Sequence, residues 1–209
     1  DETLGCGGAI LKHKSKKDNI DWLIVTKIKN TNNNSKKIKN RENEIKKVKK
    51  LYGFRNVIRM QYYTSTLDTI PKKDIIKNFK IEIDKIKPNI IYLPFKNDAH
   101  SDHRITFESV FACTKSFRAP YVKSIRVYET ISETDFSNPL IGKTFQPNLW
   151  IDISNFLEKK IKIAKIYKSE ISKHPFPRSI KNIRALSISR GASSGCNYAE
   201  AFCIIKEIK

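Results

Sequence analysis

The stretch Ile90-Ile91-Tyr92-Leu93-Pro94-Phe95-Lys96-Asn97-Asp98-Ala99-His100-Ser101-Asp102-His103-Arg104 decides the fold that this sequence predicts. Its first six residues form an apolar run typical of a buried strand, and residues 105–117 after it have the pattern of a helix. Two of the chain's four histidines therefore lie, with carboxylates, where a strand passes into a helix. This junction is the carboxyl edge of the sheet in α/β proteins, where ligands bind, so the stretch predicts a functional site.

Strand-like and helix-like segments alternate along the rest of the chain. Strands are predicted at 21–26, 56–62, 90–94, 125–129, 149–153 and 198–205, and helices at 5–14, 41–52, 70–86, 105–118 and 156–172, with a partly helical region at 175–197. Such alternation predicts an α/β fold with a mostly parallel sheet covered by helices on both faces. The 209 residues show no repeat and no linker, so we expect a single domain over 1–209.

Composition narrows the class of protein. The formal net charge of +20 raises nucleic acid as a partner, but the densest basic stretch, Lys36–Lys50, contains Glu42 and Glu44. This favours a solvated helix face over a nucleic-acid surface and leaves attraction of an anionic substrate open. The four cysteines form no CxxC pair, and neither a spanning apolar run nor a signal peptide is visible. We expect a cytoplasmic protein with reduced thiols.

The residue types at the junction suit metal-assisted chemistry. A neutral imidazole binds zinc, and a catalytic zinc keeps one position open for a water whose pKa it lowers to about 7. One of His100 and His103 could bind metal while the other, with Asp102 fixing its tautomer, transfers a proton or stabilises an oxyanion. The alternative is an ordinary polar loop in which Asp102 caps the following helix. The four residues alone favour neither interpretation.

The first residues of the chain decide between them. Asp1-Glu2-Thr3-Leu4-Gly5-Cys6-Gly7-Gly8 resembles the first signature of the LmbE-like (PIG-L) N-acetylglucosaminyl deacetylase family, in which a strand ends in Ala-His-Pro-Asp-Asp-Glu and continues Thr-Leu-Gly-Cys-Gly-Gly. The family's second signature, His-Pro-Asp-His or a close variant, matches His100-Ser101-Asp102-His103. Further matches are Arg41–Glu44, Tyr128–Thr130, Pro175–Ser179 and Tyr198–Phe202. The resemblance therefore covers essentially the whole chain and implies a Rossmann-like three-layer fold.

The resemblance also implies roles for residues at the two signatures. Asp1 and His103 match zinc ligands of the family. His100 matches the histidine that stabilises the tetrahedral intermediate or assists proton transfer, and Asp102 matches the carboxylate that orients that histidine. Zinc is the metal by resemblance, although a set of two histidines and one carboxylate can also hold Fe²⁺.

Three further residues are candidates for substrate binding. Arg41 matches an arginine that the family uses to bind substrate. Asp68 and Arg178 lie in polar turn regions that could face the sugar or its aglycone, with surface salt bridges as the alternative.

Two elements of the family pattern are missing from this sequence. The family's first zinc ligand, a histidine, and its general base, an aspartate, lie just before the position of Asp1. We therefore expect this sequence to be a piece of a longer protein that lacks the first strand and the start of the first signature. His13 falls on the helix after the glycines and His174 before Pro175, and we expect neither to replace the missing ligand.

The resemblance implies a zinc-dependent hydrolase that removes the acetyl group from an N-acetylglucosamine-type conjugate, a small molecule whose carrier stays open. A non-catalytic sugar-binding or partner-binding relative with a degenerate metal site is the alternative. A nucleic-acid binder is the third hypothesis, against which the dispersed lysines argue. The sequence leaves open whether the protein forms a homo-oligomer.

Overall fold

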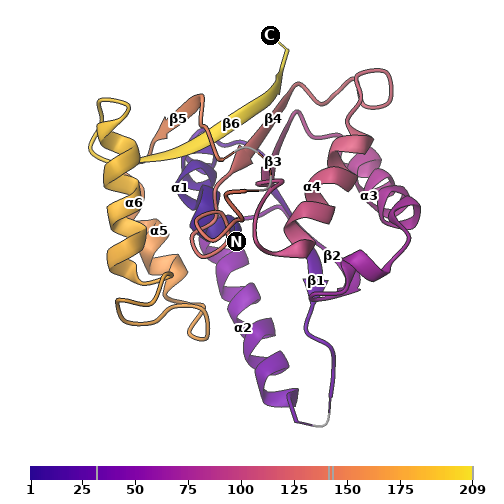
Figure 1. The fold of residues 1–209 in the computed structure, drawn as a ribbon, viewed down its shortest axis with the longest axis horizontal. Coiled ribbons are helices and arrows are strands. Elements are labelled where there is room, and N and C mark those ends of the chain that lie inside the picture. The colour runs from indigo at the N-terminus through magenta and orange to yellow at the C-terminus, as the bar shows by residue number, and fades with distance from the viewer. Residues whose placement is uncertain (32, 141, 143, 209) are drawn as a thin grey trace. The chain divides into compact units, whose positions relative to one another are not determined.

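The computed structural model describes residues 1–31, 33–140, 142 and 144–208 (Figure 1). Its elements follow the order α1 Glu2–Ser15, β1 Asp21–Lys27, α2 Ser35–Tyr52, β2 Asn56–Tyr63, η1 Leu67–Thr69, α3 Lys72–Ile86, β3 Ile90–Pro94, α4 Ser101–Cys113, β4 Ser124–Tyr128, β5 Leu149–Asp152, α5 Leu157–Ala164, α6 Ile180–Ala192 and β6 Ala199–Glu207. The chain divides into two compact units. The first comprises Asp1–Thr64 with Trp150–Glu200, and the second comprises Ser65–Leu149 with the stretch from Ala201.

The first unit contains a parallel strand pair joined by a long helix. β1 and β2 pair in parallel from Asp21 opposite Asn56, and α2 makes the crossover between them. The C-cap residue of α2 is Gly53 at φ 70°, a left-handed conformation that glycine adopts without steric cost. The predicted strands at 21–26 and 56–62 are confirmed, while α2 begins several residues earlier than the predicted helix at 41–52 because the Asn-rich segment leads directly into it.

Helix α1 begins earlier than expected and contains a bend. A loop followed by a short helix from Gly5 was predicted, but the helix runs from Glu2 and bends at Cys6, where φ is −138°. Two buried charged side chains form hydrogen bonds with backbone amides and a carbonyl on either side of the bend. The carboxylate of Glu200 accepts from the amides of Gly8 and Ala9, each at 2.7 Å, and the ammonium of Lys160 donates to the Leu4 carbonyl at 2.7 Å. The bend therefore has a cap on each side.

The second unit contains the β3–α4 junction. β3 pairs in parallel with β4, and β4 pairs antiparallel with β6. Helices α3 and α4 pack against each other and contribute the buried side chains Ile75, Phe79 and Val110 (Figure 1). The predicted strand at 90–94 is confirmed, but α4 begins at Ser101 rather than at residue 105, so Asp102 and His103 lie in its first turn instead of in the preceding loop.

The α/β class is confirmed, with helices and strands alternating along the chain. The strands form a two-stranded sheet, β1-β2, and a four-stranded sheet of order β3-β4-β6-β5. Two of the pairings with a described register are parallel and one is antiparallel. The mostly parallel, three-layer arrangement and the single domain over 1–209 stay predictions.

The C-terminal third has shorter helices than predicted. The apolar spacing of 156–172 predicted one helix, but α5 ends at Ala164 and turns follow it. Within 175–197, α6 starts at Ile180 behind Ser179, whose hydroxyl accepts from the Asn182 amide and caps the helix. In the part of the chain that the structure describes, no helix is both long enough and apolar enough to cross a membrane.

Candidate functional site

His100 is the residue that begins helix α4. It is the N-cap, and its Nδ1 accepts a hydrogen bond of 3.1 Å from the Asp102 amide. The alternative interpretation placed Asp102 as the cap of this helix, and that placement is wrong, because the imidazole of His100 accepts from the Asp102 amide and caps the helix instead. An Nδ1 that accepts a hydrogen bond has no proton, so the neutral ring of His100 carries its proton on Nε2. His100 can thus donate from Nε2.

His103 is oriented by a buried carboxylate. Its Nδ1 lies 2.7 Å from Oδ2 of Asp98, whose side chain is 0% exposed. The Thr134 hydroxyl donates to the other carboxylate oxygen of Asp98 at 2.6 Å. This arrangement places the His103 proton on Nδ1 and the ring's lone pair on Nε2, as in histidines that bind metals. The rings of His100 and His103 stack with their centroids 5.4 Å apart.

The Asp102 carboxylate holds the chain segment at the start of η1. It accepts from the amide of Ser65 at 2.7 Å and from the amide of Leu67 at 3.2 Å. One of its oxygens lies 4.0 Å from Nδ1 of His100, which is outside hydrogen-bond distance. The contact between Asp102 and His100 therefore runs through the Asp102 backbone amide. Asp98, His100, Asp102 and His103 all belong to the second unit.

Asp1 belongs to the first unit, where it is the N-cap residue of α1. Its side chain is 44% exposed. Among the residues that the structure describes, no group of three or more His, Cys, Asp or Glu side chains is arranged to hold a metal ion. The assignment of Asp1 and His103 as metal ligands stays a prediction.

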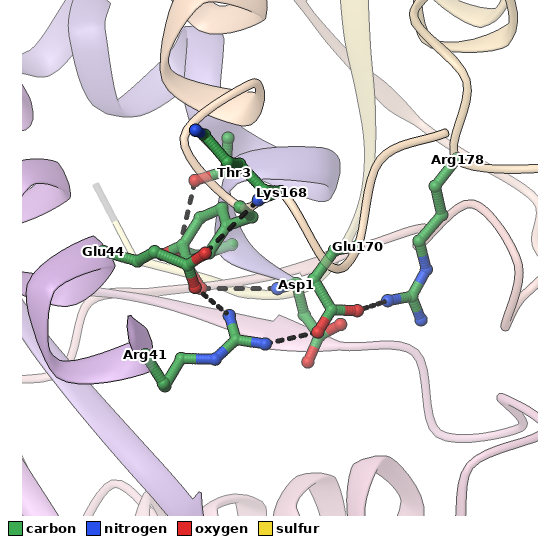
Figure 2. A network of polar contacts seen from close by, with 9 residues as sticks. Asp1, Thr3, Arg41, Glu44, Lys168, Glu170 and Arg178 are labelled. Carbon is green, nitrogen blue, oxygen red and sulfur yellow. Dashed lines mark hydrogen bonds and ion pairs between the residues drawn. The ribbon is translucent and has the colours of Figure 1, made fainter. Parts of the chain in front are cut away.

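The two arginines predicted to bind substrate contact the same carboxylate (Figure 2). Arg41 on α2 and Arg178 both donate to Glu170, Arg178 at 2.6 Å. Arg41 also lies 3.5 Å from Glu44 and stacks over the Tyr167 ring at 5.2 Å from its centroid. Burial raises the pKa of Glu170, but the two guanidinium groups outweigh it, and the net pKa is below the usual range. The network is therefore ionised at neutral pH.

The other candidates lie apart from these contacts. Asp68 is exposed within η1. His13 lies 2.7 Å from Asp18 near the end of α1, and His174 is exposed.

Two residues of the site were missed by the sequence reasoning. Asp98 stands five residues before His103, a spacing that belongs to no motif, although it lies inside the stretch that predicted the site. Glu170 is 129 residues from Arg41, and only its charge in a polar turn could have marked it.

A known protein family matches the first half of this chain. The chain combines an α/β fold with a histidine–carboxylate site where a strand passes into a helix. A family model described as "PIG-L: GlcNAc-PI de-N-acetylase" matches residues 1–114, more than half of the sequence. The chain belongs to the PIG-L family, and the resemblance seen in its sequence is confirmed.

Solved structures show the same fold at low identity. The N,N'-diacetylchitobiose deacetylase of Pyrococcus horikoshii is 20% identical to this chain with a TM-score of 0.76. The match covers 99% of this chain and 80% of the deacetylase chain. The conserved protein TT1542 of Thermus thermophilus is 19% identical with a TM-score of 0.77, and the match covers 100% of this chain and 91% of TT1542. GalB, the 4-carboxy-2-hydroxymuconate hydratase of Pseudomonas putida, is 13% identical with a TM-score of 0.74, and the match covers 100% of this chain and 93% of GalB. One fold therefore carries deacetylase and hydratase chemistry.

Proposed function

We propose that this protein is a metal-dependent hydrolase that removes the acetyl group from an N-acetylglucosamine-type conjugate. The observation that carries the proposal is the Asp98–His103 pair at 2.7 Å, which orients a histidine as metal sites require. Membership of a family described by a GlcNAc-PI de-N-acetylase supports the reaction, and a similar fold in a chitobiose deacetylase supports an amino-sugar substrate.

The donor types fit a divalent metal. His103 would bind through Nε2 and Asp1 through its carboxylate, a nitrogen and oxygen set that suits Zn²⁺ or Fe²⁺. A divalent metal held there would supply Lewis-acid chemistry, polarising the acetyl carbonyl and lowering the pKa of a water toward neutral pH. Asp98 and Thr134 then keep the His103 ring in one tautomer and orientation.

His100 would act on the developing oxyanion. Its Nε2–H can donate to the carbonyl oxygen as the tetrahedral intermediate forms, because the Asp102 amide already occupies Nδ1. Asp102 acts on His100 through this amide and anchors the segment at Ser65 and Leu67. His100 therefore contacts substrate, while Asp102 is a positioning residue.

Arg41 and Arg178 would bind the sugar conjugate, with Asp68 as a weaker candidate. Glu170 holds both guanidinium groups in fixed directions, so less side-chain entropy is lost when a substrate hydroxyl or anionic group binds.

The test is metal-dependent deacetylation by protein made from the full coding sequence. The chelated protein is supplied with Zn²⁺ or Fe²⁺ and offered N,N'-diacetylchitobiose and GlcNAc-PI, and released acetate is measured. We expect metal-restored activity that His103→Ala abolishes together with metal binding. His13→Ala is the matched control, since that histidine contacts Asp18 at the surface, and it should keep both. A His103→Ala protein that still binds metal and releases acetate would overturn the assignment. Sugar binding without stoichiometric metal would indicate the non-catalytic alternative.

A further inference from the structure

Helix α2 presents lysines on the side opposite its buried side chains. Its inner face buries Ile45, Val48 and Tyr52. With about 100° between successive residues, five exposed lysines fall within an arc of about 100° centred opposite that face. We call these five residues the α2 lysine stripe: Lys36, Lys39, Lys46, Lys47 and Lys50.

The stripe has no acidic counterpart on its own helix. Of the two glutamates of α2, Glu42 pairs with Arg59 at 2.6 Å and Glu44 pairs with Arg41. Within the described ranges of the chain, none of the five stripe lysines forms an ion pair or a side-chain hydrogen bond. Lysines elsewhere do, as in Lys72–Glu108 at 2.5 Å. The stripe is therefore a concentrated positive charge rather than a salt-bridged helix face.

This arrangement costs helix stability. Lysines three or four positions apart, such as Lys46 and Lys50 or Lys47 and Lys50, repel each other along the helix surface. The 18 residues of α2 extend over about 27 Å, several times the Debye length of about 8 Å at physiological salt. An extended anionic surface laid along the helix would relieve this repulsion at several lysines together.

We propose that the α2 lysine stripe binds the surface of an anionic lipid bilayer. The stripe follows one straight side of a helix, which suits a flat surface, and lysine ammonium groups interact with lipid headgroups as point charges. The arginines beside it are committed to carboxylates: Arg41 to Glu44 and Glu170, and Arg59 to Glu42. Nucleic-acid recognition favours arginine forks and stacked aromatic rings, and the stripe contains neither. The proposal goes beyond the proposed reaction and stands without it.

The stripe is polar throughout, so binding is electrostatic and reversible rather than by insertion. Sedimentation with vesicles of phosphatidylcholine containing roughly one-third phosphatidylserine, at about 0.15 M ionic strength, measures it. Each lysine near such a surface contributes about a fivefold factor in affinity. The triple variant Lys39→Gln, Lys46→Gln and Lys50→Gln should therefore bind roughly 100-fold more weakly. The helix content of this variant should match that of the parent protein, and its thermal midpoint should be equal or slightly higher because repulsion between the lysines is relieved.

The matched control removes the same charge elsewhere, at three exposed lysines: Lys115→Gln, Lys159→Gln and Lys181→Gln. We expect this control to bind nearly as the parent protein does. Equal losses in the two triple variants would show that overall charge, and not the stripe, is responsible. Absence of vesicle binding by the parent protein would also overturn the proposal. The proposal would also be overturned if the parent protein bound a duplex or single-stranded oligonucleotide more tightly than the vesicles at the same ionic strength, and the stripe variant lost that binding.

Discussion

Asp98 holds His103 from a fully buried position, with 2.7 Å between Oδ2 and Nδ1. The same carboxylate accepts from Thr134, so the pair is connected to the segment that follows β4. A histidine oriented in this way is ready to bind through Nε2, and the cost of ordering its ring is met when the protein folds.

The first prediction concerns this carboxylate. Asp98→Asn removes the charge that supports His103, so we expect roughly 10- to 100-fold weaker metal affinity. Competition with a chromogenic zinc chelator measures the effect. Asp135→Asn is the matched control because Asp135 is exposed in the segment after β4. The zinc affinity of this control should equal that of the parent protein. Unaltered zinc affinity in Asp98→Asn would show that the carboxylate only supports the fold.

The second prediction concerns pH. The folded-state pKa of Glu170 is lowered because Arg41 and Arg178 outweigh the effect of burial. A lowered carboxyl pKa contributes stability above the unfolded value of 4.5, and this contribution is lost as pH falls through the folded value. Glu170→Gln should therefore be less stable than the parent protein at neutral pH, with the difference shrinking below about pH 4.5. Urea midpoints along a pH series measure this. A difference that stays constant down to the acid transition would contradict it.

Much of the fold could be predicted because its elements carry their own local patterns. The strand at 90–94 is a continuous apolar run, and α2 ends at a glycine in the left-handed conformation. A helix at 5–14 was predicted, but the start of α1 at Glu2 and its bend at Cys6 were not, because the groups that complete the bend, Lys160 and Glu200, lie more than 150 residues away.

Part of the candidate site could also be predicted from the local sequence, and part could not. His100 and His103 were found from a spacing of three residues next to a strand. Asp98 lies only five residues before His103, but this spacing belongs to no motif, and Glu170 lies 129 residues from Arg41, so both were missed. Arg41 and Arg178 were selected separately, and only the structure shows that they share one carboxylate.

The third prediction concerns the buried pair Lys160–Glu200, in which each side chain is 3% exposed. Glu200→Ala leaves the ammonium of Lys160 and the amides of Gly8 and Ala9 without their carboxylate. Breaking a buried pair from one side costs about 3–5 kcal/mol in the free energy of unfolding. Glu158→Ala, which removes an exposed partner of Arg184, is the control and should cost far less. Urea unfolding compares the two, and similar costs would contradict the capping role of Glu200.

The last prediction concerns the close approach of α1 to Ile153. A Cβ at Gly8 would lie 2.5 Å from Cγ2 of Ile153, and the Ile153 side chain is fully buried. Gly8→Ala therefore forces this packed contact apart and should cost about 1–3 kcal/mol in the free energy of unfolding. Ile153→Ala creates a cavity and costs about 2–5 kcal/mol by itself. In the double variant the contacts with Cγ2 and Cδ1 are gone and only the one with Cβ at 2.8 Å remains, so the combined cost should be smaller than the sum of the two single costs. Purely additive costs would show that glycine is needed at this position for a reason other than contact with Ile153.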